Sequence, residues 1–225
     1  MHPFIEPVYE ALKKQADPAN AAAMKAYMIH HFDFFGIKTP VRDAIVKPYL
    51  KTNSLSSASE LEEVIKLLWA MPERELQYFA IDVFVTHKKY WNSTSIKLIE
   101  YCIIHQSWWD TVDGICSDWL GNYFKLNPEQ VILITSQWNK SNNIWLQRSS
   151  ILFQKSYKKA TDTILLTNYI LNCKDSKEFF IRKAIGWALR EYSKINPEWV
   201  IAFVTKNKLS LLSEKEALKI IQKKL

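Results

Sequence analysis

Two tryptophans, an aspartate and an arginine stand at spacings that would place them on one ridge of a helical structure. Trp109 and Asp113 are four residues apart, so on a helix they share a face. Arg148 follows Asp113 by 35 residues, and Trp187 follows Arg148 by 39. An indole face attracts a cation by about 0.5–2 kcal/mol. A carboxylate beside it could stabilise a cationic sugar or orient an attacking water. This set of residues suits cleavage of the N-glycosidic bond to a positively charged alkylpurine.

Each of these residues also has a structural interpretation. A tryptophan on a helix commonly fills the core, and the chain contains nine of them. Asp113 and Arg148, on neighbouring helices, could form a salt bridge between repeats. The aromatic residues Tyr27 and Phe179 could be ordinary packing residues. The pattern alone leaves both interpretations open.

The same ridge offers groups that could hold a phosphate backbone. Arg148 is one, and Phe179 and Lys183 occupy the next row on the helix that carries Trp187. Lysine pairs occur at 88–89 and 158–159. We expect these pairs at helix ends, where they complement the helix dipole, with phosphate contact as the alternative.

A repeat of 35 residues must position this ridge. Similar segments begin at Glu75, Asp110, Trp145 and Phe180, with a fainter copy at Pro40. Apolar or small residues recur four apart in each, which predicts the buried stripe of an amphipathic helix. Helix-start signals precede the segments at Thr39-Pro40, Pro72, Ser107, Asn142 and Ser176. Asn127 and Asn196, each followed by proline, are expected to cap the partner helices.

Thirty-five residues accommodate two helices and their turns, and each pair must stack on its neighbours to hide its stripe. We therefore predict an all-α fold: an α-solenoid of HEAT-like antiparallel helix pairs forming a curved superhelix, as a single domain over residues 1–225. The tetratricopeptide and ankyrin signatures are missing. The four glycines are scattered, which excludes a Rossmann fingerprint and a P-loop.

Charge and cysteine content narrow the partners and the compartment. Residues 1–112 carry a net charge of −1 and residues 113–225 a net charge of +8. A basic half favours a polyanionic partner, with nucleic acid ahead of an acidic membrane. The three cysteines have no CxxC spacing and fit free thiols in a reducing compartment. We find no signal peptide or membrane span in the sequence and expect a cytoplasmic protein.

Several longer motifs resemble one known family. The segments 107–113 (SWWDTVD), 143–148 (NIWLQR) and 177–187 (KEFFIRKAIGW) resemble the AlkD family of DNA alkylation repair glycosylases. The segments 24–28 (MKAYM), 35–40 (FGIKTP) and 72–75 (PERE) do so as well. The resemblance runs from the first residues to about Lys219, and it rests on the order and spacing of all six motifs.

The resemblance implies a fold, an activity and residue roles. It implies a HEAT-like solenoid whose concave basic face holds double-stranded DNA, and excision of N3- and N7-alkylpurines to leave an abasic site. The catalytic group would be Asp113, Trp109 and Trp187. The DNA-binding group would be Arg148, Tyr27, Phe179 and Lys183.

We further expect a monofunctional enzyme that acts as a monomer without a cofactor or a membrane partner. No metal is expected, because the histidines lack ligand spacing. In a bacterium the protein would be associated with the nucleoid. The alternative is a non-catalytic helical-repeat scaffold that binds DNA or a protein.

Overall fold

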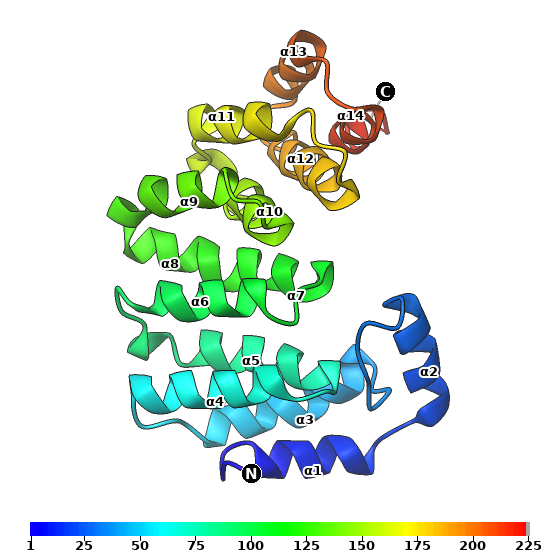
Figure 1. Cartoon of the computed structure of the whole chain (residues 1–225), viewed down its shortest axis with the longest axis vertical. Helices are drawn as coiled ribbons and strands as arrows, with labels where there is room; N and C mark the ends of the chain where they lie inside the picture. Colours follow the sequence, from blue (N-terminus) through cyan, green and yellow to red (C-terminus); the bar gives the residue numbers. More distant parts are fainter. Residues whose placement is uncertain (224–225) are drawn as a thin grey trace. The chain divides into compact units, whose positions relative to one another are not determined.

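The computed structural model describes residues 1–223 and is built from helices throughout (Figure 1). Within this described range, the only β pairing is an isolated bridge that joins Asp33 to Glu73. The chain divides into two compact units, Met1–Leu98 and Ile99–Leu225. In the described part of the chain, no helix has the length and apolar character that crossing a bilayer requires.

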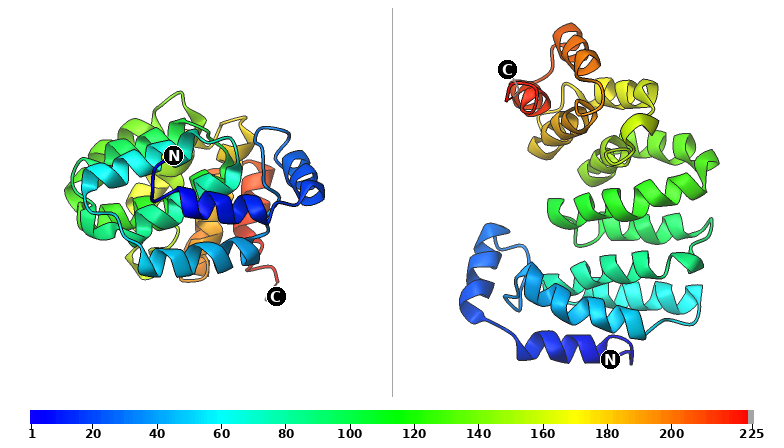
Figure 2. Two further views of the ribbon diagram at one scale, coloured as in Figure 1. Left: turned by 90° about the horizontal axis from the view of Figure 1, so that it is seen from below. Right: turned by 180° about the vertical axis from the view of Figure 1, so that it is seen from behind.

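The first unit packs short antiparallel helices against one another. Its helices are α1 (Glu6–Lys14), α2 (Pro18–Tyr27), α3 (Thr39–Thr52), α4 (Ala58–Ala70) and α5 (Arg74–Thr86), followed by the 3₁₀ turn η1 (Lys88–Tyr90). Helix α5 packs against α4 and α3, and α1 packs against α3, as Figures 1 and 2 show from several sides. Helix α6 (Ser95–Ile104) begins at the end of this unit and continues into the second.

The second unit carries the candidate ridge. After α6 come α7 (Trp109–Gly114), the π-helical η2 (Ile115–Leu120), α8 (Gly121–Leu126), η3 (Pro128–Gln130), α9 (Val131–Asn139) and α10 (Ile144–Leu152). Then follow η4 (Lys158–Ala160), α11 (Thr163–Cys173), α12 (Phe179–Tyr192), α13 (Pro197–Asn207) and α14 (Leu211–Leu218). Helix α10 packs against α9 and α12, and α12 packs most extensively against α14.

The predicted period is confirmed. Helices α3, α5, α7, α10 and α12 begin at Thr39, Arg74, Trp109, Ile144 and Phe179, and each start lies 35 residues after the one before. The residues expected in the stripe are all buried: Leu76, Ala80, Thr111, Ile115, Leu146, Ser150, Ile181 and Ile185. The stripe therefore forms the core, and the fold is an all-α helical repeat.

The capping predictions are confirmed only in part. Asn196 accepts a hydrogen bond from the backbone N–H of Trp199 and caps α13. Helix α10 is capped by Asn143, one residue after the expected Asn142. Asn127 does not cap α9, because the turn η3 intervenes; its amide instead donates to the carbonyl of Tyr123 at the end of α8.

The loop between α2 and α3 is held by one buried carboxylate. Glu75 on α5 is fully buried and accepts hydrogen bonds from the backbone N–H groups of Phe35, Gly36 and Ile37 at 3.1, 2.9 and 3.0 Å. Gly36 has a φ of 88°, and a Cβ there would lie 2.1 Å from the carbonyl oxygen of Asp17. The motifs at 35–40 and 72–75 therefore belong to one structural contact.

Candidate functional site

The helix that carries Trp109 and Asp113 has an unusual backbone. It runs from Trp109 to Leu126, but a π-helical stretch from Ile115 to Leu120 interrupts its α-helical hydrogen bonding just after Asp113. Such single-turn π segments are rare and occur often at functional sites. No sequence signal indicated this one.

Asp113 and Arg148 form a paired fork across α7 and α10. Arg148 Nε donates to Asp113 Oδ1 at 2.8 Å, and Nη2 donates to Oδ2 at 2.8 Å. A third donor, Nη1, bonds the backbone carbonyl of Phe180 at the start of α12. The side chain of Arg148 is 2% exposed and that of Asp113 is 12% exposed. The guanidinium thus fixes both carboxylate oxygens and leaves only an edge of Asp113 accessible.

Asp113 and Arg148 therefore form the salt bridge between repeats that the sequence allowed as one interpretation. It does not remove the functional interpretation, because a bidentate arginine also fixes the direction of a reactive carboxylate. The burial of Arg148 favours this positioning role over direct phosphate contact, which remains a prediction.

Trp187 lies among three cations. The guanidinium of Arg148 is 5.7 Å from its ring centroid, that of Arg190 is 5.3 Å away, and the Nζ of Lys155 is 5.6 Å away. Trp109 and Trp187 are both half-buried, so neither is a fully enclosed core residue. Sequence reasoning missed two of these cations. Arg190 is three residues from Trp187 and Lys155 seven from Arg148, and either helical spacing could have indicated them.

Aromatic residues join the first turns of three parallel helices. The rings of Trp108, Trp145 and Phe180 lie 5.0–5.8 Å apart, centroid to centroid. Phe179 packs edge-on against Phe180, yet it is 51% exposed. This cluster aligns the helix starts that present Asp113 and Arg148, and Phe179 is its most accessible ring.

Lys183 is held in an ion-pair network on α12. Its Nζ lies 2.7 Å from Glu216 Oε1, while Arg190 Nη1 lies 2.8 Å from Glu216 Oε2. The hydrogen bond that Lys183 donates to Glu216 is the main factor that lowers the pKa of Glu216. A Cβ at Gly186 would lie 2.5 Å from the Cβ of Glu216, so only glycine lets α14 approach this closely. DNA contact by Lys183 remains a prediction.

Tyr27 ends α2 in the first unit and is 70% exposed. This exposure is compatible with contact to DNA, and the assignment of Tyr27 to the DNA-binding group remains a prediction.

A thiol lies beneath the carboxylate. Cys116, in the π-helical stretch, is fully buried, and this burial raises the pKa of its thiol to about 12. Cys102 and Cys173 are also buried. In the described part of the chain, His, Cys, Asp and Glu side chains form no group of three or more that could hold a metal ion.

These observations define a helical-repeat protein in which an arginine-fixed carboxylate lies beside half-buried indoles. The chain matches the model of the DNA alkylation repair enzyme family over residues 8–221. A solved structure described as a predicted DNA alkylation repair enzyme from Enterococcus faecalis is 33% identical, with a TM-score of 0.86. The match covers 92% of this chain and 97% of that one. No curated protein matches the chain.

The chain belongs to the DNA alkylation repair enzyme family. Its role is accordingly in DNA repair.

Proposed function

We propose that the protein is a monofunctional DNA glycosylase that hydrolyses the N-glycosidic bond of positively charged N3- and N7-alkylpurines in duplex DNA. The observation that carries the proposal is the Asp113 carboxylate, held by Arg148 at two points and open at one edge. Cleavage of this bond places positive charge on the deoxyribose. A fixed anion stabilises that charge without reorganising as the bond breaks.

Water attack completes the reaction in this proposal. The alkylated base leaves as a neutral molecule because it already carries the positive charge, so no acid is needed to protonate it. Asp113 orients a water against the sugar carbon and accepts its proton as the new bond to oxygen forms, and the proton then passes to solvent. Trp109 and Trp187 border the sugar and limit access of other water.

The cysteines favour excision over transfer of the alkyl group to a thiol. Alkyl transfer needs a thiolate, because the thiolate is the nucleophilic form of cysteine. Cys116 is the thiol nearest in sequence to Asp113, and burial raises its pKa to about 12. Cys102 and Cys173 are buried as well. These environments support a reaction in which the base, rather than the alkyl group, is removed.

DNA binding would use exposed aromatic residues and basic residues of the two units. Phe179 offers an open ring, and Tyr27 a second one on the first unit. Lys183 would contribute positive charge although it is paired with Glu216, whereas the buried Arg148 would act by fixing Asp113. The net charge of the chain, +7, suits binding to double-stranded DNA. We propose that the protein binds it as a monomer in the cytoplasm.

Base release from defined DNA tests the proposal. The parent protein and Asp113→Asn are incubated with a duplex that contains one N7-methylguanine, and free base is quantified while DNA binding is measured in parallel. We expect release by the parent alone, with binding retained by both. If neither protein releases N7-methylguanine, N3-methyladenine or a bulkier cationic adduct while both bind DNA, the glycosylase assignment is wrong.

The same two proteins distinguish the glycosylase from the second candidate function, a non-catalytic scaffold. The bidentate Asp113–Arg148 pair favours that candidate, because a salt bridge between repeats is also what a purely structural role would need. A scaffold predicts that the parent binds DNA and releases no base.

A further inference from the structure

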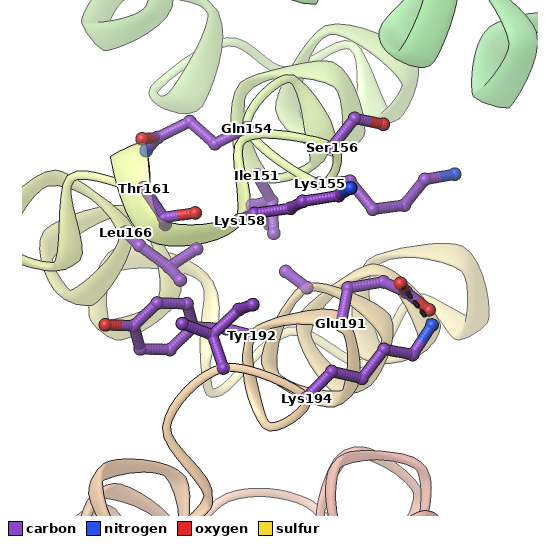
Figure 3. Close-up of a pocket in the computed structure, with 12 residues that line it drawn as sticks. Ile151, Gln154, Lys155, Ser156, Lys158, Thr161, Leu166, Glu191, Tyr192 and Lys194 are labelled. Carbon is purple, nitrogen blue, oxygen red and sulfur yellow. Dashed lines mark hydrogen bonds and ion pairs between the residues drawn. The ribbon is translucent and has the colours of Figure 1, made fainter.

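A pocket lies in the second unit near Trp187, and Lys155 is common to this pocket and to the surroundings of Trp187. It is a pocket of about 270 Å³ between the end of α10, the turn η4, α11 and the last turn of α12 (Figure 3). This volume is slightly below the roughly 300 Å³ at which pockets for drug-sized ligands begin. It therefore suits a small ligand.

The walls of this pocket are apolar and aromatic. They include Ile151, Leu166, Ala188 and Ile195, together with the ring of Tyr192. Tyr192 is itself fixed, because it packs edge-on against Trp199 with a centroid distance of 5.3 Å. A planar apolar ring could therefore lie against a preformed surface.

The mouth of the pocket is cationic. Lys155, Lys158 and Lys194 line it with one acid, Glu191, which pairs with Lys194 at 2.6 Å. Within residues 1–223, neither Lys155 nor Lys158 forms an ion pair with a carboxylate. Figure 3 shows their amines on the same side of the pocket, opposite the ring of Tyr192. Two positive charges thus lie beside an apolar wall, and that of Lys155 also faces the ring of Trp187 at 5.6 Å and attracts the carboxylate of Asp118.

The loop that carries Lys158 is held in place. The side chain of Gln154 accepts a hydrogen bond from the backbone N–H of Asp162 at 2.7 Å and donates one to its carbonyl at 3.3 Å. Lys158 has a φ of 54°, in the left-handed region that non-glycine residues seldom adopt. Strain of this kind persists only where surrounding contacts impose it, and it collects at binding sites.

We propose that this pocket binds a nucleotide unit, with the base against Tyr192 and the phosphate between Lys155 and Lys158. The hydroxyls of Ser156 and Thr161 also line it and can bond the edge of the base. A phosphate fits between the two lysines, because its oxygens can accept from two ammonium groups at once. The nucleotide is either a free monophosphate or part of a DNA strand. The inference does not depend on glycosylase activity.

Calorimetric titration with deoxyadenosine monophosphate tests the site. We expect saturable binding to the parent protein, and at least tenfold weaker binding by Lys155→Gln/Lys158→Gln. Deoxyadenosine, which lacks the phosphate, should bind the parent at least tenfold more weakly than the monophosphate does. The matched control is Lys159→Gln, which removes the same charge from the same turn but does not line the pocket.

Three results would overturn the proposal: no binding of the monophosphate by folded parent protein, equal affinity for nucleoside and nucleotide, or equal weakening by Lys159→Gln. Competition then identifies the source of the nucleotide. Displacement of the monophosphate by a short single-stranded oligonucleotide assigns the pocket to a DNA strand, and absence of displacement assigns it to a free nucleotide.

Discussion

Two carboxylates, one fully buried in the first unit and one partly buried in the second, contrast a structural role with the chemical role that we propose. Glu75 is fully buried and accepts three backbone N–H groups from the loop at 35–37. Asp113 is 12% exposed and is held by the side chain of Arg148. Both lie in the first two turns of helices that begin 35 residues apart, α5 and α7.

The difference lies in what holds each carboxylate and in what remains open. Backbone amides fix Glu75 as part of the loop itself, so its removal would disturb the chain around it. A guanidinium fixes the direction of Asp113, while one edge still faces outward. A buried acid with no exposed edge stabilises the fold, whereas one that is fixed and partly open can act on a ligand.

The largest expected effect on stability is at Glu75. Glu75→Ala removes one acceptor from three buried N–H groups, and each unsatisfied group costs about 1–3 kcal/mol. We expect the free energy of unfolding to fall by about 3 kcal/mol or more, measured by urea denaturation. Glu62→Gln, at an exposed pair with Lys66, should change it by less than about 0.5 kcal/mol. Similar losses in the two variants would remove the distinction between these sites.

Arg148→Lys tests whether the guanidinium fixes the direction of Asp113. Lysine keeps the charge but loses the planar fork, so Asp113 loses its fixed direction. We expect base release in single-turnover assays to fall by roughly 10–100-fold.

Salt dependence separates this positioning role from phosphate contact. For Arg148→Gln, the slope of log binding constant against log salt should stay unchanged. A decrease of about 0.9 in its magnitude would instead show a lost phosphate contact.

A smaller effect is expected at Glu216, where a carboxylate is paired without a role in the proposed chemistry. Because the pKa of Glu216 is lowered in the folded protein, chiefly by Lys183, its contribution is present above the ordinary value of 4.5 and is lost as the pH falls further. We expect Glu216→Gln to cost about 1–2 kcal/mol at pH 7 and to approach the parent in stability near pH 3. Thermal unfolding at both pH values measures this, and a difference that is the same at both would be inconsistent with the pairing.

The smallest expected effect concerns Cys116. Since burial raises the pKa of this thiol to about 12, an alkylating reagent should modify it only on unfolding. Mass spectrometry after brief treatment at pH 8 should find Cys116 unmodified in the native protein and modified in denaturant. Rapid native modification would mean that the thiol is accessible, and it would weaken the argument for base excision.

Much of the fold could be predicted because the repeat is strict. The helix starts and the buried stripe follow directly from the 35-residue period, since both depend on local spacing. The prediction that Asn127 caps α9 was wrong, because the 3₁₀ turn η3 lies between them. The π-helical stretch and the close approach of α14 to Gly186 depend on tertiary packing, for which a single sequence has no signal.

One pair of residues in the candidate site was predictable from the sequence, but the surrounding network was not. The 35-residue spacing correctly placed Asp113 and Arg148 on neighbouring helices, where they pair. It could not show that Phe180 supplies a carbonyl to Arg148, because that contact depends on side-chain reach. Nor could it show that Lys183 and Arg190 share Glu216, which lies on a helix outside the strict period.

The most direct test compares Asp113→Asn with Glu75→Gln in both stability and chemistry. Unfolding free energy and single-turnover base release per folded molecule are measured for each. We expect Asp113→Asn to lose at least about 100-fold in rate with a modest change in stability. Glu75→Gln should lose about 2 kcal/mol in stability while its folded molecules react at nearly the parent rate. An active Asp113→Asn, or equal rate losses in the two variants, would contradict the division between a functional and a structural carboxylate.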